Sequence, residues 1–270
     1  MDPDTPPGSP ILAGAQASPI RSLFLLADSQ LLFWKDGGAL FLERVRAELG
    51  PAPPRAAYLG ASNGDVPEFY EIFVAAMEGI GVGACRMIPA SPSAEDRAFL
   101  EEASVILLAG GDAARGMRAF QESGLAERIL ARYAAGAVLI GVSAGAVQLG
   151  QRIPTGRDGG DPHTPGPAGP DEGSAHRASM DGFRLVPLLI GVHEEPEWAA
   201  LGERVAALEG SARGIGIPSG SGAVVHPDLS VEPVRKTLVE VSLVDGAVRH
   251  ALLWPGRADA RSTESGGAPT

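Results

Sequence analysis

Cysteine is almost absent from this chain of 270 residues, which contains only Cys85. A single cysteine excludes an intrachain disulfide, and it gives no sign of an oxidising compartment. Cys85 lies in the apolar segment 83–88, which is typical of a strand, and a free cysteine in such a segment is usually a buried, unreactive thiol. We therefore do not place Cys85 in a catalytic site.

Positive charge is also scarce. Lysine occurs only as Lys35 and Lys236, and the 22 lysines and arginines face 33 aspartates and glutamates, which gives a formal net charge of −11. Nucleic acids and anionic membrane surfaces repel a chain of this charge over a broad contact. We therefore expect neither a nucleic-acid partner nor a membrane partner, although the net charge does not describe the local charge inside a pocket.

Long apolar runs are missing, and none approaches the roughly 20 residues that a bilayer-spanning helix needs. Residues 1–19 contain Asp2, Asp4 and several prolines but no lysine or arginine, so they lack the cationic start of a secretory signal. Residues 1–19 and 256–270 both have the composition of disordered tails. These features predict a cytoplasmic protein.

The most informative segment is residues 137–146, in which an apolar run leads into Gly141-Val142-Ser143-Ala144-Gly145. A serine on a tight turn between a strand and a helix needs small residues on both sides, because the backbone approaches itself closely there. Such a turn exposes the hydroxyl and points the first N–H groups of the helix toward whatever the serine attacks. A glycine-rich turn that merely contains a serine is the alternative, but the flanking strand-like and helix-compatible residues favour a nucleophile at Ser143.

Segments typical of strands and helices alternate through the first 150 residues. The expected strands are Leu23–Ala27, Arg55–Gly60, Ala84–Ile88, Val105–Ala109 and Ala137–Val142, and the helices between them include Gly38–Leu49, Glu68–Ile80 and Ala94–Ala103. This alternation predicts an α/β fold of three layers, in which helices cover both faces of a mostly parallel sheet. Further short strands are predicted at Phe183–His193, Gly214–Ile217 and Gly222–His226, and residues 238–253 predict a C-terminal β-hairpin.

We expect residues 20–255 to form a single α/β domain, with the segment 151–181 as an interruption. This segment is rich in glycine, proline and aspartate and has no periodicity, which is typical of a functional lid or of disorder. His163 and His176 lie in it, but no cysteine and no ligand spacing accompany them. We therefore expect no metal site and no cofactor.

Several motifs resemble the aspartyl dipeptidase (peptidase E) and cyanophycinase family of serine peptidases. They are Tyr58–Asp65, Ala109–Asp112, Ile140–Ala146, Leu185–Leu188 leading to His193, and Gly216–Gly220, and they cover most of residues 20–230. The resemblance implies a fold similar to that of class I glutamine amidotransferases, and a serine that attacks small peptides or aspartyl-linked polymers. By position, it implies that Ser143 is the nucleophile and His193 the general base.

The histidines allow the same assignment to be argued from chemistry. A serine hydroxyl is a poor nucleophile unless a base takes its proton, and histidine suits that role near neutral pH. His193 ends an apolar segment, so we expect it at the carboxyl edge of the sheet, where active sites of such folds lie. His226 precedes a proline turn and His250 lies in the C-terminal hairpin, so we interpret both as structural or exposed.

The acid that would orient His193 departs from the family pattern. The dipeptidases have a glutamate between proline and glycine, where this chain has Ser219. Glu195 follows His193 by two residues, which is the spacing of amidotransferase-like triads, and residues i and i+2 of an extended segment share a face. Glu194 would then point away, and both glutamates would alternatively be the solvated start of a helix at 197–208. Glu195 is our first choice, but Glu194 and the absence of any carboxylate partner stay open.

Acyl transfer also needs N–H donors for the oxyanion. The N–H of Ala144, directly after the proposed nucleophile, is one donor. The turn Gly110-Gly111-Asp112 resembles the second donor and substrate-binding site of the family, although a plain turn at the end of a strand is an equal alternative when Gly110-Gly111 is considered alone. Because the turns at 60–65, 110–112 and Ser143 all follow expected strands, we predict that they lie along one rim of the sheet.

These features predict a serine hydrolase that cleaves a small peptide, with aspartyl or isoaspartyl peptides as the class that the resemblance implies. A glutamine amidotransferase is disfavoured, because those enzymes use cysteine where this chain has Ser143. A catalytically weakened binding or scaffold protein is the alternative, because Ser219 replaces the glutamate of the relatives. Arg115, Arg118 and Arg152 are candidate ligands for a substrate carboxylate, and a homodimer is a candidate assembly.

Overall fold

A seven-stranded sheet forms the centre of the computed structural model, which describes residues 20–155, 179–193, 196–208 and 212–256. The strand order is β13-β12-β1-β7-β6-β4-β5. The strands are β1 (Leu23–Leu26), β4 (Arg55–Leu59), β5 (Ala84–Ile88), β6 (Val105–Leu108), β7 (Val138–Val142), β12 (Gly222–Val225) and β13 (Val231–Val234). The five strands from β1 to β5 in this order are parallel, and β12 and β13 extend the β1 edge in antiparallel pairing.

The central strands are apolar on both faces because helices cover both. In β1, Leu23 and Leu25 belong to one buried cluster, whereas Phe24 and Leu26 belong to the cluster on the opposite face. A strand that is buried on both faces reads as a continuous apolar run rather than as an alternating one. This burial explains the unbroken apolar sequences of β1, β6 and β7.

Helices pack on the sheet in two layers. The helices α1 (Glu43–Glu48) and α2 (Pro67–Glu78) contribute to one buried cluster. The opposite cluster takes residues from α3 (Ala94–Glu101), α4 (Ala113–Glu122), α5 (Leu125–Ala134) and α6 (Ala144–Leu149). The predicted three-layer α/β fold with a mostly parallel sheet is therefore confirmed. None of the helices in these described ranges is long and apolar enough to cross a membrane.

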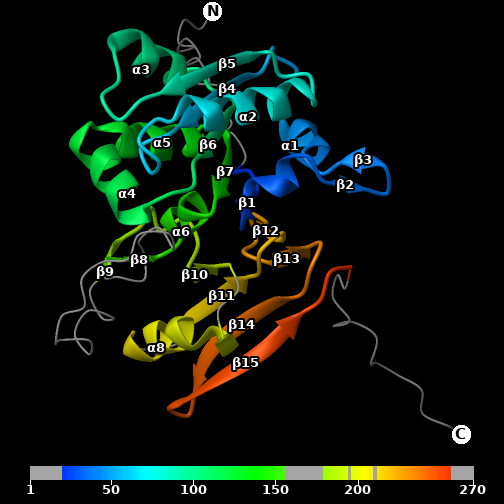
Figure 1. The fold of residues 1–270 in the computed structure, drawn as a ribbon, viewed down its shortest axis with the longest axis vertical. Coiled ribbons are helices and arrows are strands. Elements are labelled where there is room, and N and C mark those ends of the chain that lie inside the picture. Colours follow the sequence, from blue (N-terminus) through cyan, green and yellow to red (C-terminus); the bar gives the residue numbers. More distant parts are fainter. Residues whose placement is uncertain (1–19, 156–178, 194–195, 209–211, 257–270) are drawn as a thin grey trace, which may run out of the picture.

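A second sheet lies at the end of the molecule opposite α3 and β5 (Figure 1). The sequence predicts its strands, but it does not predict that they form a sheet of their own. Its order is β10-β11-β14-β15, built from β10 (Leu189–Val192), β11 (Arg213–Ile217), β14 (Leu238–Val244) and β15 (Ala247–Leu253). The helix α8 (Ala199–Ala207) packs on this sheet and buries Leu201 and Val205 against it. The pairing of β14 with β15 confirms the predicted C-terminal hairpin.

Two expected elements differ from the structure. The segment 38–49 is not one helix: β2 (Lys35–Asp36) pairs with β3 (Ala39–Leu40), and only α1 is helical. Gly37 and Gly38 both have a positive φ, which favours the tight turn of this hairpin over a helix. A short 3₁₀ helix, η1 (Ser29–Leu32), precedes the hairpin and begins at Asp28, whose side chain accepts a hydrogen bond from the N–H of Gln30.

The segment 183–193 is a strand only over β10. Its first residues instead satisfy the carbonyl groups at the end of α6, because the N–H groups of Phe183, Arg184 and Leu185 donate to the carbonyls of Gln148, Gly150 and Leu149. The last carbonyls of a helix lack partners within the helix, so a segment that supplies donors stabilises its end. The segment 183–188 thus caps α6 with its backbone N–H groups and packs its apolar side chains into the core, and it is not part of a sheet.

The interruption at 151–181 is ordered at its two ends. Residues of β8 (Arg152–Pro154) pair in antiparallel fashion with β9 (Ser179–Asp181), and Arg152 forms an ion pair with Asp181 at 2.8 Å. The prediction of a structureless stretch is therefore wrong for these six residues. Residues 156–178, which carry most of the lid prediction, lie outside the described residues. The predicted tail at 1–19, and the predicted tail at 256–270 apart from Gly256, also lie outside them.

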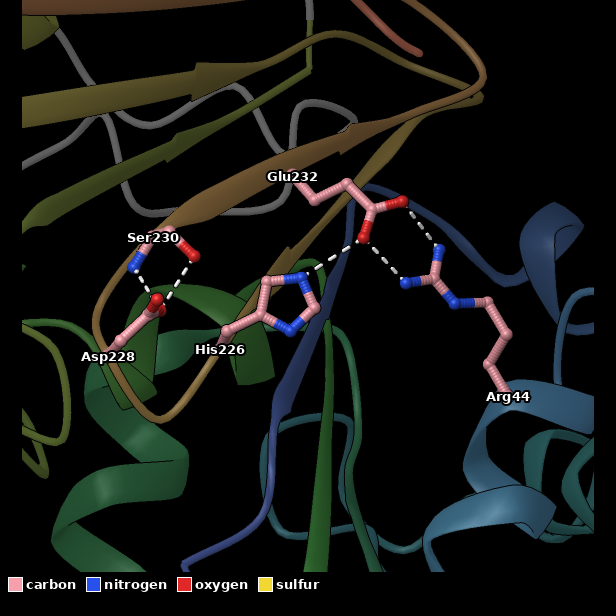
Figure 2. A network of polar contacts seen from close by, with 5 residues as sticks. All are labelled: Arg44, His226, Asp228, Ser230 and Glu232. Atoms are coloured by element: carbon pink, nitrogen blue, oxygen red, sulfur yellow. Dashed lines mark hydrogen bonds and ion pairs between the residues drawn. The ribbon is translucent and has the colours of Figure 1, made fainter. Parts of the chain in front are cut away.

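A polar network ties α1 to the antiparallel edge of the large sheet (Figure 2). Arg44 of α1 donates two hydrogen bonds, of 2.9 and 2.6 Å, to the carboxylate of Glu232 in β13. His226 Nε2 lies 3.0 Å from the same carboxylate. Asp228 closes the turn between β12 and β13 by accepting hydrogen bonds from the N–H and the hydroxyl of Ser230. These contacts fix the hairpin whose first strand follows the Ser219 turn.

Candidate active site

Ser143 occupies a strained turn between β7 and α6. Its backbone has φ 50° and ψ −110°, which a residue other than glycine adopts rarely, and such strain costs about 1–3 kcal/mol. The surrounding structure holds this conformation: the N–H of Ser143 donates to the carbonyl of Leu26 at 2.8 Å, and its carbonyl accepts from Ala146 at 2.9 Å. The turn therefore presents the hydroxyl at the carboxyl edge of the sheet, as the sequence predicts.

The two glycines that flank this turn are required by close backbone contacts. A Cβ on Gly141 would lie 2.6 Å from the backbone nitrogen of Ala146, and a Cβ on Gly145 would lie 2.1 Å from the carbonyl oxygen of Leu108. Real Cβ atoms do not approach other heavy atoms this closely. The small residues on both sides of Ser143 therefore follow from packing of α6 against β7 and β6.

His193 lies directly after β10, and its ring reaches the serine. The distance from His193 Nε2 to Ser143 Oγ is 2.9 Å, which is a hydrogen bond. His193 also has a positive φ of 71°, so strained backbone presents both side chains of this pair. The His193 side chain is exposed, and the pair lies open to the cavity described below.

Glycines of the second sheet, which carries His193 at the end of β10, leave room for the ring of Trp198. Trp198 packs across this sheet, where a Cβ on Gly216 would lie 2.5 Å from the indole ring and a Cβ on Gly191 would lie 3.4 Å from it. The indole is 93 % shielded from solvent, with 7 % exposed. Trp198 belongs to η3 (Pro196–Trp198), so its burial anchors η3 on the second sheet.

Ser219 faces the other nitrogen of the His193 ring. Its Oγ lies 3.4 Å from His193 Nδ1, at the long end of hydrogen-bond distances. Two contacts fix this turn: Asp28 accepts a hydrogen bond of 2.5 Å from the N–H of Gly220, and Lys236 donates one of 2.6 Å to the carbonyl of Ser219. Residues 194–195, and with them the predicted partner Glu195 and its alternative Glu194, lie outside the described residues.

The turn after β6 lies against the serine. A Cβ on Gly110 would lie 3.3 Å from the Cβ of Ser143 and 4.0 Å from its Oγ. Gly111 has a φ of +126°, and a Cβ there would lie 2.2 Å from the carbonyl oxygen of Ser62, so only glycine fits. Ala144 begins α6, where an N–H has no acceptor within the helix. The backbone of Gly110 therefore lies close to the Ser143 side chain, and Ala144 directly follows Ser143 at the start of α6.

Asp112 stabilises this turn through two hydrogen bonds. Its side chain caps α4 by accepting a hydrogen bond of 2.8 Å from the N–H of Arg115, and its own N–H donates to Ser62 at 2.9 Å. Asp112 also lines the cavity. The carboxylate therefore holds the shape of the turn while it faces the space in front of Ser143.

A cavity of about 890 Å³ opens in front of Ser143 and His193. Its walls come from both sides of the large sheet: Leu32, Tyr58 and Phe73 belong to the α1–α2 side, whereas Val147 and Ile190 belong to the other. A cavity of this size accommodates a small peptide. The arrangement brings the Ser143 hydroxyl, the His193 imidazole and the Gly110-Gly111 turn into one concave site, and acyl transfer uses groups of these kinds.

The arginines of the cavity differ in part from those predicted. Arg115 lines it, as predicted, and its guanidinium also donates to the carbonyl of Ser62. Arg118 and Arg152 are absent from its lining, and Arg152 is paired with Asp181. Arg204 of α8, which is not among the predicted arginines, also lines the cavity. Its position on the apolar helix at 199–207 gives no local sequence signal for a binding role.

The described residues contain no group of three or more histidine, cysteine, aspartate or glutamate side chains that could hold a metal ion. Cys85 lies on β5, outside the cavity lining. Burial, with a smaller contribution from Glu78, raises the pKa of its thiol to about 11. The thiol is therefore protonated at neutral pH.

A serine on a strained strand-to-helix turn, hydrogen-bonded to a histidine at the edge of a mostly parallel sheet, defines the serine-hydrolase class of α/β proteins. The sequence comparison gives the family. The chain belongs to peptidase family S51, whose model matches residues 34–227, and it is a serine-type peptidase.

Solved structures agree on the fold. A peptidase from an acI-B1 Actinobacterium is 16 % identical with a TM-score of 0.60, over 88 % of this chain and 95 % of that one. A candidate peptidase E from Listeria monocytogenes EGD-e is 17 % identical with a TM-score of 0.56, over 80 % of this chain and 98 % of that one. The fold is therefore that of peptidase E-type proteins. Among curated proteins, none matches this chain in sequence.

Proposed function

We propose that this peptidase hydrolyses small peptides through an acyl-enzyme on Ser143, with His193 as the general base. The observation that carries the proposal is the hydrogen bond of 2.9 Å between Ser143 Oγ and His193 Nε2 on a turn that exposes the serine. A serine within hydrogen-bond reach of a histidine is the arrangement that activates the hydroxyl for nucleophilic attack.

In the first half of the proposed reaction, His193 Nε2 takes the proton of Ser143 as Oγ attacks the peptide carbonyl carbon. The carbonyl oxygen then becomes an oxyanion, which the N–H groups of Ala144 and of the Gly110-Gly111 turn stabilise. His193 returns the proton to the leaving amine, and the peptide C–N bond breaks. A water molecule repeats these steps on the acyl-enzyme and releases the free acid.

His193 can act as this base only in one tautomer, with the proton on Nδ1. Ser219 Oγ, at 3.4 Å from Nδ1, can accept that proton in a hydrogen bond and so favours the productive tautomer. A hydroxyl does not stabilise the imidazolium by charge as a carboxylate would. We keep Glu195 as the proposed carboxylate partner, on its spacing of two residues from His193.

The proposed substrate carries a carboxylate. Arg115 and Arg204 border the cavity, and a guanidinium binds a carboxylate through two parallel hydrogen bonds. In a dipeptide this group is the C-terminal carboxylate, and in the aspartyl or isoaspartyl peptides that the family resemblance implies it is also a side chain. Neither assignment needs a cofactor.

The second candidate function is a binding or scaffold protein with weakened catalysis. It is favoured by one observation, namely that a neutral Ser219 faces His193 Nδ1 where the dipeptidases have a glutamate. Such a protein would bind peptides in the cavity without turning them over.

A panel of dipeptides and isoaspartyl dipeptides, followed by amine release, tests the proposal. We expect turnover by the unmodified protein and a loss of at least a thousandfold in kcat for Ser143→Ala, with binding retained. Ser230→Ala, a change of the same kind in the exposed turn before β13, is the control and keeps full activity. Wild-type turnover in Ser143→Ala would overturn the proposal, and binding without turnover in the unmodified protein would favour the second candidate.

A further inference from the structure

We infer that Phe69 and Ile72 of α2 form an apolar subsite, which receives an apolar side chain of the peptide beside the scissile bond. The inference rests on the proposed function, because it assigns a substrate class to the same cavity. It predicts that this peptidase prefers an aromatic or branched aliphatic residue to an aspartate at one of the two positions that flank the cleaved bond.

The first observation is the exposure of these two side chains. Phe69 is 49 % exposed and Ile72 is 36 % exposed, although most large apolar side chains of the chain are buried. They are three residues apart in α2, so they share one face of the helix. Both line the cavity that contains Ser143 and His193. Their exposed surface is therefore available to a ligand in that cavity.

The second observation is the apolar floor beneath them. Leu32, Tyr58, Phe73 and Leu107 line the same cavity, and each is at most 3 % exposed. Tyr58 and Phe73 also pack ring against ring, with centroids 5.5 Å apart. A rigid aromatic floor under two exposed apolar side chains suits an apolar guest, because such a guest removes apolar surface from water.

The third observation is the distribution of charge. The two arginines that line the cavity, Arg115 and Arg204, come from α4 and α8, and α2 contributes none of the lining cations. Asp28, four residues before Leu32 in the chain, also lines the cavity, and its negative charge disfavours an acidic side chain nearby. An aspartate placed against α2 would therefore lose its water without gaining a cationic partner from this helix.

Two series of dipeptides, X-Ala and Ala-X, test the subsite when X is Ala, Leu, Phe or Asp. In one series we expect kcat/KM for Phe and Leu to exceed that for Asp by at least tenfold. Phe69→Ala should lower kcat/KM for the Phe peptide about tenfold more than for the Ala peptide, and Ile72→Ala should do the same to a smaller degree. An apolar pocket commonly contributes factors of this size to selectivity.

Phe33→Ala is the matched control. Phe33 is 48 % exposed, almost the same as Phe69, but it is absent from the cavity lining. The selectivity of this variant should equal that of the unmodified protein. A preference for Asp in both series, or a preference for Phe that survives both Phe69→Ala and Ile72→Ala, would overturn the inference.

A binding measurement separates this inference from the proposed function. Calorimetry on Ser143→Ala, with the amides of N-acetyl-phenylalanine and N-acetyl-aspartate as ligands, reports the subsite without turnover. We expect tighter binding of the phenylalanine amide, reduced about tenfold by adding Phe69→Ala. This result supports the subsite even if no dipeptide is hydrolysed. Binding of the phenylalanine amide that Phe69→Ala leaves unchanged refutes the subsite even if Ser143 proves to be the nucleophile.

Discussion

At the scale of single residues, Ser219 is the feature that sets this site apart from the carboxylate triads. A hydroxyl near His193 Nδ1 orients the ring, but it offers no negative charge to the imidazolium that forms during attack. How much this missing charge lowers the rate of catalysis depends on whether Glu195 supplies a negative charge instead. The two roles can be separated, because orientation acts at every pH whereas a charge changes the pH dependence.

Substituting Ser219 tests this separation. Ser219→Glu should move the acid limb of the kcat/KM profile to higher pH, because a carboxylate beside the ring favours its protonated form. Ser219→Gln introduces a side chain of the same length as glutamate but without its charge, so it should leave the acid limb of the kcat/KM profile unchanged. The measurement is a pH–rate profile between pH 5 and 9 for each variant. An unchanged limb in Ser219→Glu would mean that position 219 does not act on His193.

The companion change is Glu195→Gln. If Glu195 is the carboxylate partner, this variant should lower kcat by orders of magnitude, and Glu194→Gln should do much less. Ser219→Glu should then restore part of the activity of Glu195→Gln, because both positions act on one imidazole. Equal and small losses in both glutamine variants, without rescue, would contradict the assignment of Glu195.

Cys85 gives a second prediction at this scale. Because burial raises the pKa of its thiol to about 11, only about one thiol in three thousand is ionised at pH 7.5. Iodoacetamide should therefore leave the activity unchanged at pH 7.5, and mass spectrometry should detect adducts quickly only as the pH approaches 11. Rapid inhibition at pH 7.5 that substrate prevents would place the active site elsewhere.

At the scale of elements, the packing of α6 on β6 fixes where Ser143 lies. Gly145 allows the helix to touch the backbone of β6, since a Cβ would lie 2.1 Å from the carbonyl oxygen of Leu108. The start of α6 carries both Ser143 and the N–H of Ala144. A small shift of this helix therefore moves the nucleophile and an oxyanion donor together.

Gly145→Ala should consequently lower the free energy of unfolding by about 3 kcal/mol, the upper part of the range for overpacking. Chemical denaturation measures this change. Gly83→Ala is the control, because nothing lies within 4 Å of its Cβ position and its φ is ordinary. It should be neutral, or stabilising by about 0.5 kcal/mol through the unfolded state. Equal stability of both variants would refute the close packing of α6.

The network of Arg44, Glu232 and His226 predicts a pH dependence of stability (Figure 2). The hydrogen bonds from Arg44 hold the pKa of Glu232 below its usual range. A carboxylate with a lowered pKa in the folded state stabilises the fold above its unfolded pKa of about 4.3. That contribution is lost as the pH falls through the lower, folded value.

Glu232→Gln should therefore lower stability at pH 7 by on the order of 1 kcal/mol, since the pair is partly exposed. Thermal denaturation between pH 3 and 7 should show this difference shrinking below pH 4. Glu122→Gln, at an exposed residue with no ion pair to any described residue, is the control. A difference that stays constant down to pH 3 would contradict the assigned role of Arg44.

At the scale of the whole molecule, the sequence predicts the part of the fold in which each strand or helix has its own local pattern of apolar residues. The alternation of apolar strands with amphipathic helices predicts the five parallel strands and both helix layers, because each element carries its own signal. The strands of the second sheet are predicted as well, but nothing in the sequence indicates that β10 and β11, which are separated by α8, pair with the C-terminal hairpin in a sheet of their own. The glycines of β10 and β11 leave room for the ring of Trp198, and this contact is visible only in the folded structure.

The same division holds for the candidate site. Ser143 and the turn at Gly110-Gly111 can be read from short motifs, and His193 from its place after an apolar segment. Asp28, which holds the Ser219 turn through Gly220, is 192 residues away from that turn in sequence. Arg204 likewise reaches the cavity only because α8 packs on the second sheet. Long-range contacts of this kind leave no local pattern.

Covalent labelling with a fluorophosphonate, located by peptide mass spectrometry, tests the central claim most directly. This reagent reacts with an activated serine hydroxyl and forms a stable phosphonyl adduct. The account predicts one adduct per chain, on Ser143, lost in Ser143→Ala, slowed at least a hundredfold in His193→Ala and unchanged in Ser230→Ala. An adduct on another residue, or labelling that persists in Ser143→Ala, would contradict the claim that Ser143 is the nucleophile of this peptidase.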